Sequence, residues 1–178
     1  MNLTRATAGD LPDIVALMNR AYRGQDGWAV EQGYIQGDRV SLPDLQAELA
    51  AKPQMQLLVW REAGALLGCV SLEPLDGGAW YLGALTVEPD RQDAQLGRRL
   101  LAEAERIARE AGAQCMRLSV IWVRAALIAW YQRRGYLATG ETAPFPYGDE
   151  RWGRPMRDDL HFLLFEKILS IGDSRSDP

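Results

Sequence analysis

Residues that build cross-links and metal sites are scarce in this chain, which has two cysteines and one histidine among 178 residues. Two cysteines are too few for the disulfide framework of a small secreted domain. The single His161 cannot form a metal site with them at any recognisable spacing, so we expect no metal. Cys69 and Cys115 lie in apolar, strand-like stretches, which predicts buried thiols that take no part in covalent catalysis.

Long apolar runs are also missing. No segment approaches the roughly 20 apolar residues that cross a bilayer, and the first residues lack the apolar core of a secretory signal. The formal net charge is −4, which argues against a nucleic-acid or anionic-membrane partner, since these usually require a basic face. We therefore expect a cytoplasmic protein with no nucleic-acid partner and no membrane partner.

The length and the hydrophobic fraction of 47% suit one compact domain with a sizeable core. Apolar spacings of three and four predict helices after Asp10, over 41–52, 95–112 and 124–135, and short runs rich in β-formers predict strands between them. The predicted strands are a short one near the N-terminus, then 54–62, 65–73, 79–87, 113–123, 136–141 and 160–169. This order favours an α/β sandwich with a mixed sheet that is mostly antiparallel at its start.

Two segments show neither the apolar spacing of a helix nor the apolar run of a strand. Residues 24–40 are rich in glycine and aromatics and predict a loop or a broken helix. Residues 142–159 form a connection too long to be a plain turn, and loops of that length are often functional. We expect a single domain over residues 1–168 and a disordered polar tail over 169–178.

One stretch, LTVEPDRQDAQLGRRLLAEAERIA at residues 85–108, begins as a strand, turns after Pro89 and continues as an amphipathic helix. Such a turn leaves backbone N–H groups unpaired at the start of the helix. Successive N–H groups and the positive end of the helix dipole form an anion-binding nest. The pattern is typical of an anion site, although an ordinary strand-to-helix connection has the same outline.

This stretch resembles the best signature of the GNAT superfamily of N-acetyltransferases, a strand ending in V-x-P and then Q/R-x-x-G-x-G/A at the start of a helix. The matching positions are Val87, Glu88, Pro89, Gln92 and Gly97. Gln95 stands where the family has its first glycine, so a positive φ at this position would cost on the order of 1 kcal/mol.

A second GNAT signature is a helix that ends in a tyrosine and a G-Y or G-F pair. Residues 123–136, VRAALIAWYQRRGY, match it through Tyr131, Gly135 and Tyr136. Arg124 stands where many members have asparagine at the start of the helix. The order of elements along nearly the whole chain also resembles the superfamily.

The resemblance implies a GNAT-like α/β fold, in which a mixed, mostly antiparallel central sheet is flanked by helices on both faces. It also implies acetyl-CoA as the co-substrate, with its pyrophosphate at the turn from Gln92 to Arg98. The residues expected to bind it are Leu85, Thr86, Val87, Gln92, Asp93, Ala94, Gln95, Leu96, Gly97, Arg98 and Arg124. Asp93 and Ala94 lack the positive charge that is common in this turn.

The resemblance further assigns the catalytic groups. In GNATs a tyrosine at the position of Tyr131 protonates the departing thiolate of coenzyme A, and a phenol with a pKa near 10 can do so at neutral pH. The base that takes the proton of the amine is often a glutamate. Ser119 occupies one position where some members carry it, which leaves Glu73 and Glu31 as candidates, with Glu73 preferred. Backbone N–H groups near Leu85 to Val87 could stabilise the oxyanion.

The two irregular segments are expected to form the wall of the acceptor pocket. The early one contributes Trp28, Glu31, Tyr34 and Arg39, and the late one contributes Phe145, Tyr147 and Trp152. Aromatic and acidic side chains together suit a small cationic amine. The same aromatics could instead plug the core or form a homodimer contact.

Two functions are consistent with these patterns. The first is an N-acetyltransferase that moves an acetyl group from acetyl-CoA to a primary amine, on a small molecule or a peptide, by direct attack in a ternary complex without an acyl-enzyme. The second is a non-catalytic module on the same fold that senses acyl-CoA or interacts with another chain. Tyr131 and the strand end at Val87 to Pro89 favour the enzyme, whereas Asp93 and Gln95 favour the module.

Overall fold

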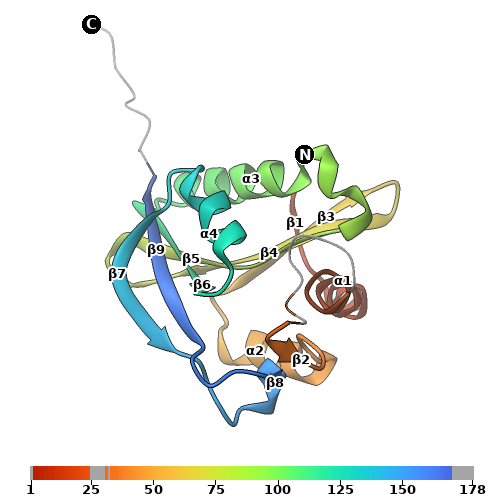
Figure 1. Cartoon of the computed structure of the whole chain (residues 1–178). Helices are drawn as coiled ribbons and strands as arrows, with labels where there is room; N and C mark the ends of the chain where they lie inside the picture. The colour runs from red at the N-terminus through yellow and green to blue at the C-terminus, as the bar shows by residue number, and fades with distance from the viewer. Residues whose placement is uncertain (1, 25–30, 32, 170–178) are drawn as a thin grey trace, which may run out of the picture.

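The computed structural model describes residues 2–24, 31 and 33–169 (Figure 1). A seven-stranded sheet forms the centre, with β5 and β6 parallel and every other neighbouring pair antiparallel. In spatial order the strands are β1 (Thr4–Arg5), β3 (Gln56–Glu62), β4 (Ala65–Pro74), β5 (Ala79–Val87), β6 (Cys115–Ile121), β9 (His161–Ile168) and β7 (Leu137–Pro144).

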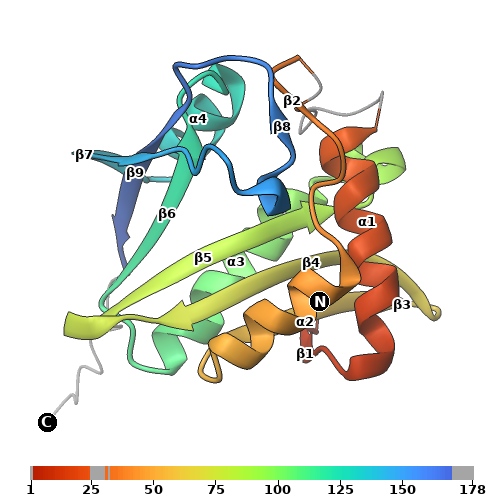
Figure 2. The ribbon, with the colours of Figure 1, turned by 90° about the horizontal axis from the view of Figure 1, so that it is seen from below.

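Helices cover both faces of this sheet. The chain has α1 (Leu11–Arg23) and α2 (Leu42–Ala51) on one face and α3 (Leu96–Glu110) on the other, while α4 (Ala125–Gln132) lies beside β6 (Figures 1 and 2). Short 3-10 helices occupy Ala8–Asp10, Asp76–Gly78, Pro89–Ala94 and Glu150–Trp152. The fold class predicted from the sequence is confirmed.

The strand β3 shows why its sequence is apolar without alternation. Leu58 and Trp60 pack into the core beneath α3, whereas Leu57 and Val59 pack into the core beneath α1 and α2. A strand covered on both faces buries successive side chains in opposite directions, so that a continuous apolar run is required. The sheet therefore divides the interior into two cores.

The sheet splits between β5 and β6. These parallel strands pair only over residues 79–81 and 115–117, and then diverge (Figure 2). From Leu82 onward, no strand of the described residues pairs with the β5 edge that faces β6. Such an edge can bind an extended ligand, since unpaired strand edges are templates for further pairing.

A β-bulge lies in β5 where the strands diverge. Cys69 pairs with Thr86 and Ser71 pairs with Gly83, so that two residues of β5 lie opposite one residue of β4. Ala84, within the bulge, has a φ of 49°, a left-handed conformation that costs an L-residue roughly 1–2 kcal/mol. A local hydrogen bond stabilises this conformation of Ala84, because the Thr86 hydroxyl donates to the Ala84 carbonyl at 3.0 Å.

The two irregular segments are joined to each other. Strand β2 (Ile35–Gln36) from the early segment pairs with β8 (Arg154–Pro155) from the late one. Ile35 is fully buried and packs with Phe145 and Leu160 in a third, small core. The late loop is shorter than the sequence predicted, since β7 continues to Pro144.

The end of the domain needs a correction of one residue. Leu169, assigned to the tail by the sequence, is 1% exposed and donates its N–H to the Gln114 carbonyl at 2.9 Å. It therefore belongs to the folded domain, while the rest of the predicted tail, 170–178, lies outside the described residues. Within the described ranges, no helix has the length and apolar character to span a bilayer.

Candidate active site

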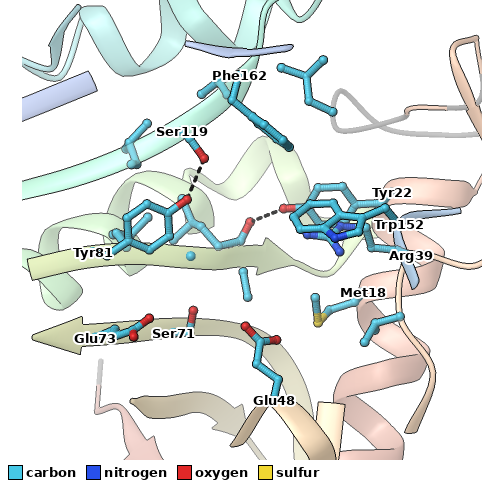
Figure 3. Close-up of a pocket in the computed structure, with 18 of the residues that line it drawn as sticks. Met18, Tyr22, Arg39, Glu48, Ser71, Glu73, Tyr81, Ser119, Trp152 and Phe162 are labelled. Atoms are coloured by element: carbon cyan, nitrogen blue, oxygen red, sulfur yellow. Dashed lines mark hydrogen bonds between the residues drawn. The ribbon is translucent and has the colours of Figure 1, made fainter. Parts of the chain in front are cut away.

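A cavity of about 550 Å³ lies between α1, α2, the split in the sheet and α4 (Figure 3). Its size is that of a small-molecule site. Of the residues that the sequence assigned to a site, Glu31, Arg39, Glu73, Leu85, Arg124 and Tyr131 line it. They come from four separate parts of the chain, the early segment, β4, β5 and α4, so that only the fold brings them together.

A polar row crosses the cavity face of the sheet. Ser71 and Glu73 of β4, Tyr81 of β5 and Ser119 of β6 alternate with residues that point into the core beneath α3. Glu73 lies opposite Tyr81 in the strand register, and the hydroxyls of Tyr81 and Ser119 are 2.6 Å apart (Figure 3). The row places a carboxylate beside two hydroxyl groups close to the split.

Glu73 is paired with a cation. Lys52, which follows α2, places its Nζ 3.0 Å from a Glu73 carboxylate oxygen and 3.5 Å from a Glu48 oxygen. Burial opposes the charge on Lys52, but its hydrogen bond to Glu73 and the nearby carboxylates raise the pKa of Lys52. This end of the cavity carries two carboxylates and one ammonium group.

Tyr131 lines the cavity from α4. Its side chain is 6% exposed, and its ring packs edge-on against Trp130 and Tyr136 at centroid distances of 5.0 and 5.5 Å. Burial raises the pKa of Tyr131, because the ionised phenolate would lose its hydration. The phenol is therefore protonated at neutral pH and is a proton donor at the cavity wall.

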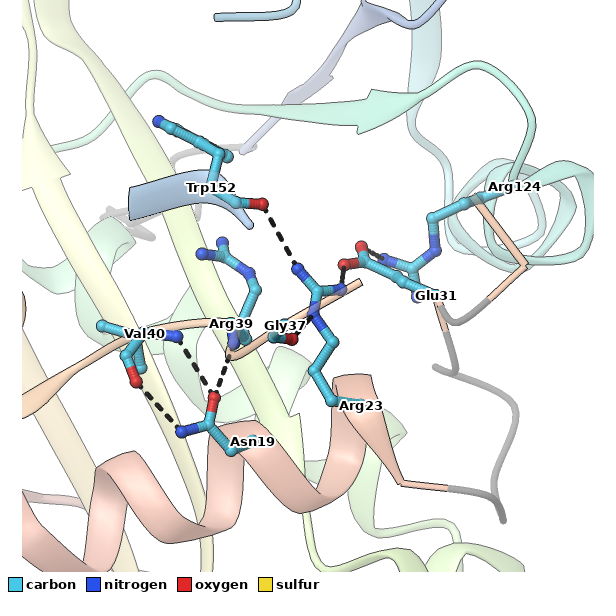
Figure 4. Close-up of polar contacts among 8 residues, drawn as sticks. All are labelled: Asn19, Arg23, Glu31, Gly37, Arg39, Val40, Arg124 and Trp152. Carbon is cyan, nitrogen blue, oxygen red and sulfur yellow. Dashed lines mark hydrogen bonds and ion pairs between the residues drawn. The ribbon is translucent and has the colours of Figure 1, made fainter. Parts of the chain in front are cut away.

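Glu31 connects the early segment to α4. Its carboxylate pairs with Arg23 at the end of α1 and with Arg124 at the start of α4, where the closest N–O distance is 3.1 Å (Figure 4). The Glu31 side chain is only 5% exposed. Arg124 was expected to contact the cofactor, but one of its contacts is with Glu31, which was predicted to line the acceptor pocket.

Arg39 is held between two aromatic rings. Its guanidinium carbon lies 5.4 Å from the ring centroid of Tyr22 and 5.2 Å from that of Trp152. The Asn19 side chain fixes its backbone, accepting from the N–H groups of Arg39 and Val40 at 2.7 and 3.1 Å (Figure 4). The side chain and backbone of Arg39 are both positioned by α1 and the late loop.

The end of β5 lies between the cavity and the turn at residues 89–95 that leads into α3. Leu85 lines the cavity, and its carbonyl accepts from the Tyr22 hydroxyl at 3.3 Å. Thr86 and Val87 are 3% and 6% exposed, with the Val87 side chain in the core beneath α3. Any contact of Thr86 or Val87 with a ligand would therefore be made by the backbone.

The turn after β5 has the geometry of an anion nest at the start of α3. Gln95 adopts φ 56° and ψ 22°, a left-handed conformation, and its carbonyl accepts the first helical bond, from the Arg99 N–H at 3.0 Å. The N–H groups of Leu96, Gly97 and Arg98 precede that bond and have no carbonyl within the helix. Gln92, Asp93 and Ala94 contribute the 3-10 turn that leads into it.

Replacing Gln95 with glycine is expected to keep or raise coenzyme A affinity while apo stability changes little, because two opposing effects nearly cancel. Glycine removes the left-handed strain of roughly 1 kcal/mol and opens the backbone to phosphate, but it adds unfolded-state freedom worth roughly 0.4–1 kcal/mol. Calorimetric titration with coenzyme A, together with urea unfolding, separates the two effects. A tenfold loss of affinity in a folded variant would show instead that the glutamine side chain itself contacts the ligand.

A second, basic cavity of about 530 Å³ adjoins the first turns of α3. Arg98, Arg133 and Arg134 line it together with Lys167 and Glu105, and the last two pair at 2.6 Å. Burial and the neighbouring Arg133 and Arg98 lower the pKa of Arg134. An anion bound there would relieve the repulsion among the arginines, which suits a phosphate group near the predicted nest.

Some sequence assignments do not reach the cavity. Tyr34 packs against the small core of Ile35 and Phe145 rather than lining the pocket. Burial raises the pKa of Tyr34, and its buried hydroxyl has no hydrogen-bond partner in the described residues. Trp28 lies outside the described residues. Trp152 lines the cavity, whereas Phe145 is buried in the small core and Tyr147 is 45% exposed.

Sequence reasoning also missed several residues of the cavity. Tyr22 and Tyr81 bring hydroxyl groups to it, and Lys52 and Glu48 set the charge around Glu73. The period-two alternation of β5 would have found Tyr81, since its neighbours Trp80 and Leu82 belong to the core. In the described ranges, no three His, Cys, Asp or Glu side chains lie close enough together to hold a metal ion.

A split sheet, a turn with free helix N–H groups at the start of α3 and a cavity lined by an acid and a phenol suit an acyl-coenzyme A transferase. Sequence comparison agrees. Residues 15–136 match the acetyltransferase (GNAT) family, and the chain belongs to this family. It is an N-acetyltransferase, and acetyl-CoA is its acetyl donor.

Relatives and solved structures extend the match. An IAA acetyltransferase of Azospirillum brasilense is 34% identical over 108 residues, which are 60% of this chain and 69% of the relative. The ribosomal-protein-alanine N-acetyltransferase of Brucella melitensis superposes with a TM-score of 0.68 at 24% identity, over 95% of this chain and all of that one. The yncA protein of Salmonella typhimurium, solved with its cofactor acetyl-CoA, superposes with a TM-score of 0.66 at 22% identity. The match covers 100% of this chain and 97% of that one.

Proposed function

We propose that the protein transfers the acetyl group of acetyl-CoA to a primary amine, on a small molecule or a peptide, by direct attack in a ternary complex. The observation that carries this proposal is the cavity itself, whose lining includes Glu73 of β4 and Tyr131 of α4. One is a carboxylate that can accept a proton, and the other is a protonated phenol that can donate one.

The donor is proposed to lie along the split of the sheet. The backbone N–H groups of Leu96, Gly97 and Arg98 would hold its pyrophosphate, and Arg98 and Arg134 would hold a further phosphate in the basic cavity. The unpaired edge of β5 supplies backbone partners for the arm between pyrophosphate and thioester. When bound, acetyl-CoA supplies an acetyl group activated as a thioester.

Three groups of this chain are then proposed to act in the transfer, as a base, as an oxyanion site and as a general acid. Glu73, directly or through water, accepts a proton from the acceptor amine as the nitrogen forms its bond to the acetyl carbon. Backbone N–H groups near Leu85 to Val87 stabilise the negative charge that develops on the carbonyl oxygen. As the carbon–sulfur bond breaks, Tyr131 gives its proton to the departing thiolate and is reprotonated from solvent.

The cysteines favour direct attack over an acyl-enzyme. Cys69 is fully buried, and burial raises the pKa of its thiol to about 12, so it is not a thiolate at neutral pH. Cys115 is partly buried, and burial raises the pKa of its thiol as well. Neither thiol lines the cavity.

The test is acetyl-CoA binding followed by turnover. At about 100 times its dissociation constant, acetyl-CoA is expected to stabilise the fold by roughly 2.7 kcal/mol, seen as a rise in the melting temperature. Release of free thiol with a panel of primary amines measures the transfer. No thermal shift at millimolar acetyl-CoA would overturn the assignment of the donor site, and binding without thiol release would favour the non-catalytic module.

A further inference from the structure

Arg39 differs from the other arginines of the cavity. Arg23 and Arg124 both contact the Glu31 carboxylate. Arg39 pairs with no carboxylate in the part of the chain that the structure describes, and its guanidinium donates no hydrogen bond there. Its side chain is nevertheless part of the cavity lining. A cation that is positioned in a cavity, and that finds no counter-ion among the described residues, indicates that a ligand supplies the anion.

The geometry around Arg39 suits a planar anion. The guanidinium of Arg39 lies over the rings of Tyr22 and Trp152, a cation–π contact that uses no N–H group. The Asn19 bonds hold the backbone of Arg39, so that little ordering is needed when a ligand binds. A guanidinium fork matches a carboxylate through two parallel hydrogen bonds.

The other end of the cavity carries the opposite charge. Glu48 and Glu73 share the single ammonium of Lys52. In Figure 3, Arg39 lies with Tyr22 and Trp152 at one side of the cavity, and Glu73 and Glu48 lie away from it, nearer β4. The cavity therefore has a cationic side and an acidic side, and Tyr81 lies beside Glu73 on the acidic side.

Resting on the proposed function, we propose that the acceptor is a free amino acid or a close analogue, whose carboxylate is bound by Arg39 while its amine faces Glu73. The aromatic walls and acids alone would suit a simple cationic amine. Arg39 opposes that choice, because a purely cationic acceptor would leave the guanidinium without its anion and add a second positive charge to the cavity. The class of acceptor is therefore zwitterionic.

The test uses free amino acids, each compared with its own C-terminal amide, which keeps the amine and removes the negative charge. With saturating acetyl-CoA, thiol release should give kcat/KM values about ten- to a hundredfold higher for the preferred acids than for their amides, mainly through KM. Arg39→Gln should remove most of that preference by weakening the acids far more than the amides. Arg39→Lys, which keeps the charge but not the fork, should fall between the two.

A binding measurement accompanies the kinetics. Titration of the same acids and amides into the protein with coenzyme A present tests the carboxylate site without turnover, and Arg5→Gln, an exposed arginine on β1 outside the cavity, is the control for a change of charge. If amides bind and react as well as acids, or if Arg39→Gln weakens both alike, the proposal is wrong. If acids bind in preference but no acceptor releases thiol, the carboxylate site holds and the proposed transfer fails.

Discussion

Replacing Tyr131 with phenylalanine is expected to lower kcat by about 10²–10⁴-fold, which is the usual contribution of a positioned general acid. The substitution keeps the ring that packs against Trp130 and Tyr136 and removes only the hydroxyl. The fold and the affinity for acetyl-CoA should therefore change little. Single-turnover kinetics, with calorimetry of coenzyme A binding, measure the two quantities separately.

The pH dependence gives this prediction a second readout. Burial raises the pKa of Tyr131 above the ordinary value near 10, so that the native protein keeps the donor protonated through neutral and mildly alkaline pH. The deficit of the phenylalanine variant should thus persist up to at least about pH 9. Unchanged turnover, in conditions where the chemical step limits the rate, would remove Tyr131 from the mechanism.

Tyr136→Phe is a matched control for the loss of a buried hydroxyl. Tyr136 is fully buried next to Tyr131, and its hydroxyl donates to Glu105 at 3.0 Å rather than facing the cavity. Removing it leaves the reacting groups in place and takes one hydrogen bond from Glu105, which keeps its pairing with Lys167. The cost should fall on stability, by roughly 1 kcal/mol, rather than on kcat.

The fold was accessible from the sequence because its signals are local. The apolar stripe of α3, the turn after Pro89 and the run of β-formers in β3 each follow from the spacing of neighbouring residues. The left-handed conformation at Gln95 was less accessible, since only the comparison with a glycine in the GNAT signature drew attention to it. Gly83 precedes the left-handed Ala84, but the bulge at this position depends on pairing with β4, which no local pattern of residues predicts.

The acceptor side was harder to predict because its contacts cross long stretches of chain. Arg39 and Glu31 were both assigned to the pocket, but nothing local distinguishes an arginine that a glutamate neutralises from one that remains available. Tyr34 looked equivalent to them and packs elsewhere, because β2 pairs with β8 and turns that part of the segment toward Phe145. Such distinctions depend on which loops meet in the folded chain.

Glu73 was predicted from the sequence, but its contacts were not, and its replacement is the second change from which we expect a large loss of activity. The sequence placed it at the end of a strand near the centre of the sheet, and the structure adds the Lys52 ion pair and the opposing Tyr81. Lys52 places a positive charge beside the Glu73 carboxylate. Because the predicted acceptor brings its own ammonium group, Glu73 can exchange Lys52 for the substrate amine and then accept its proton.

Glu73→Gln keeps the size and polarity of the side chain and removes the base, so kcat/KM at neutral pH is expected to fall by about 10²–10⁴-fold. The deficit should narrow as the pH rises toward the pKa of the acceptor amine, because an amine that is already deprotonated no longer needs the carboxylate. Glu48→Gln, which removes the other carboxylate near Lys52, should cause a much smaller loss. A pH profile of kcat/KM for both variants decides the matter. A deficit in Glu73→Gln that stays constant at all pH values, or that Glu48→Gln reproduces, would mean that Glu73 shapes the charge of the pocket without acting as the base.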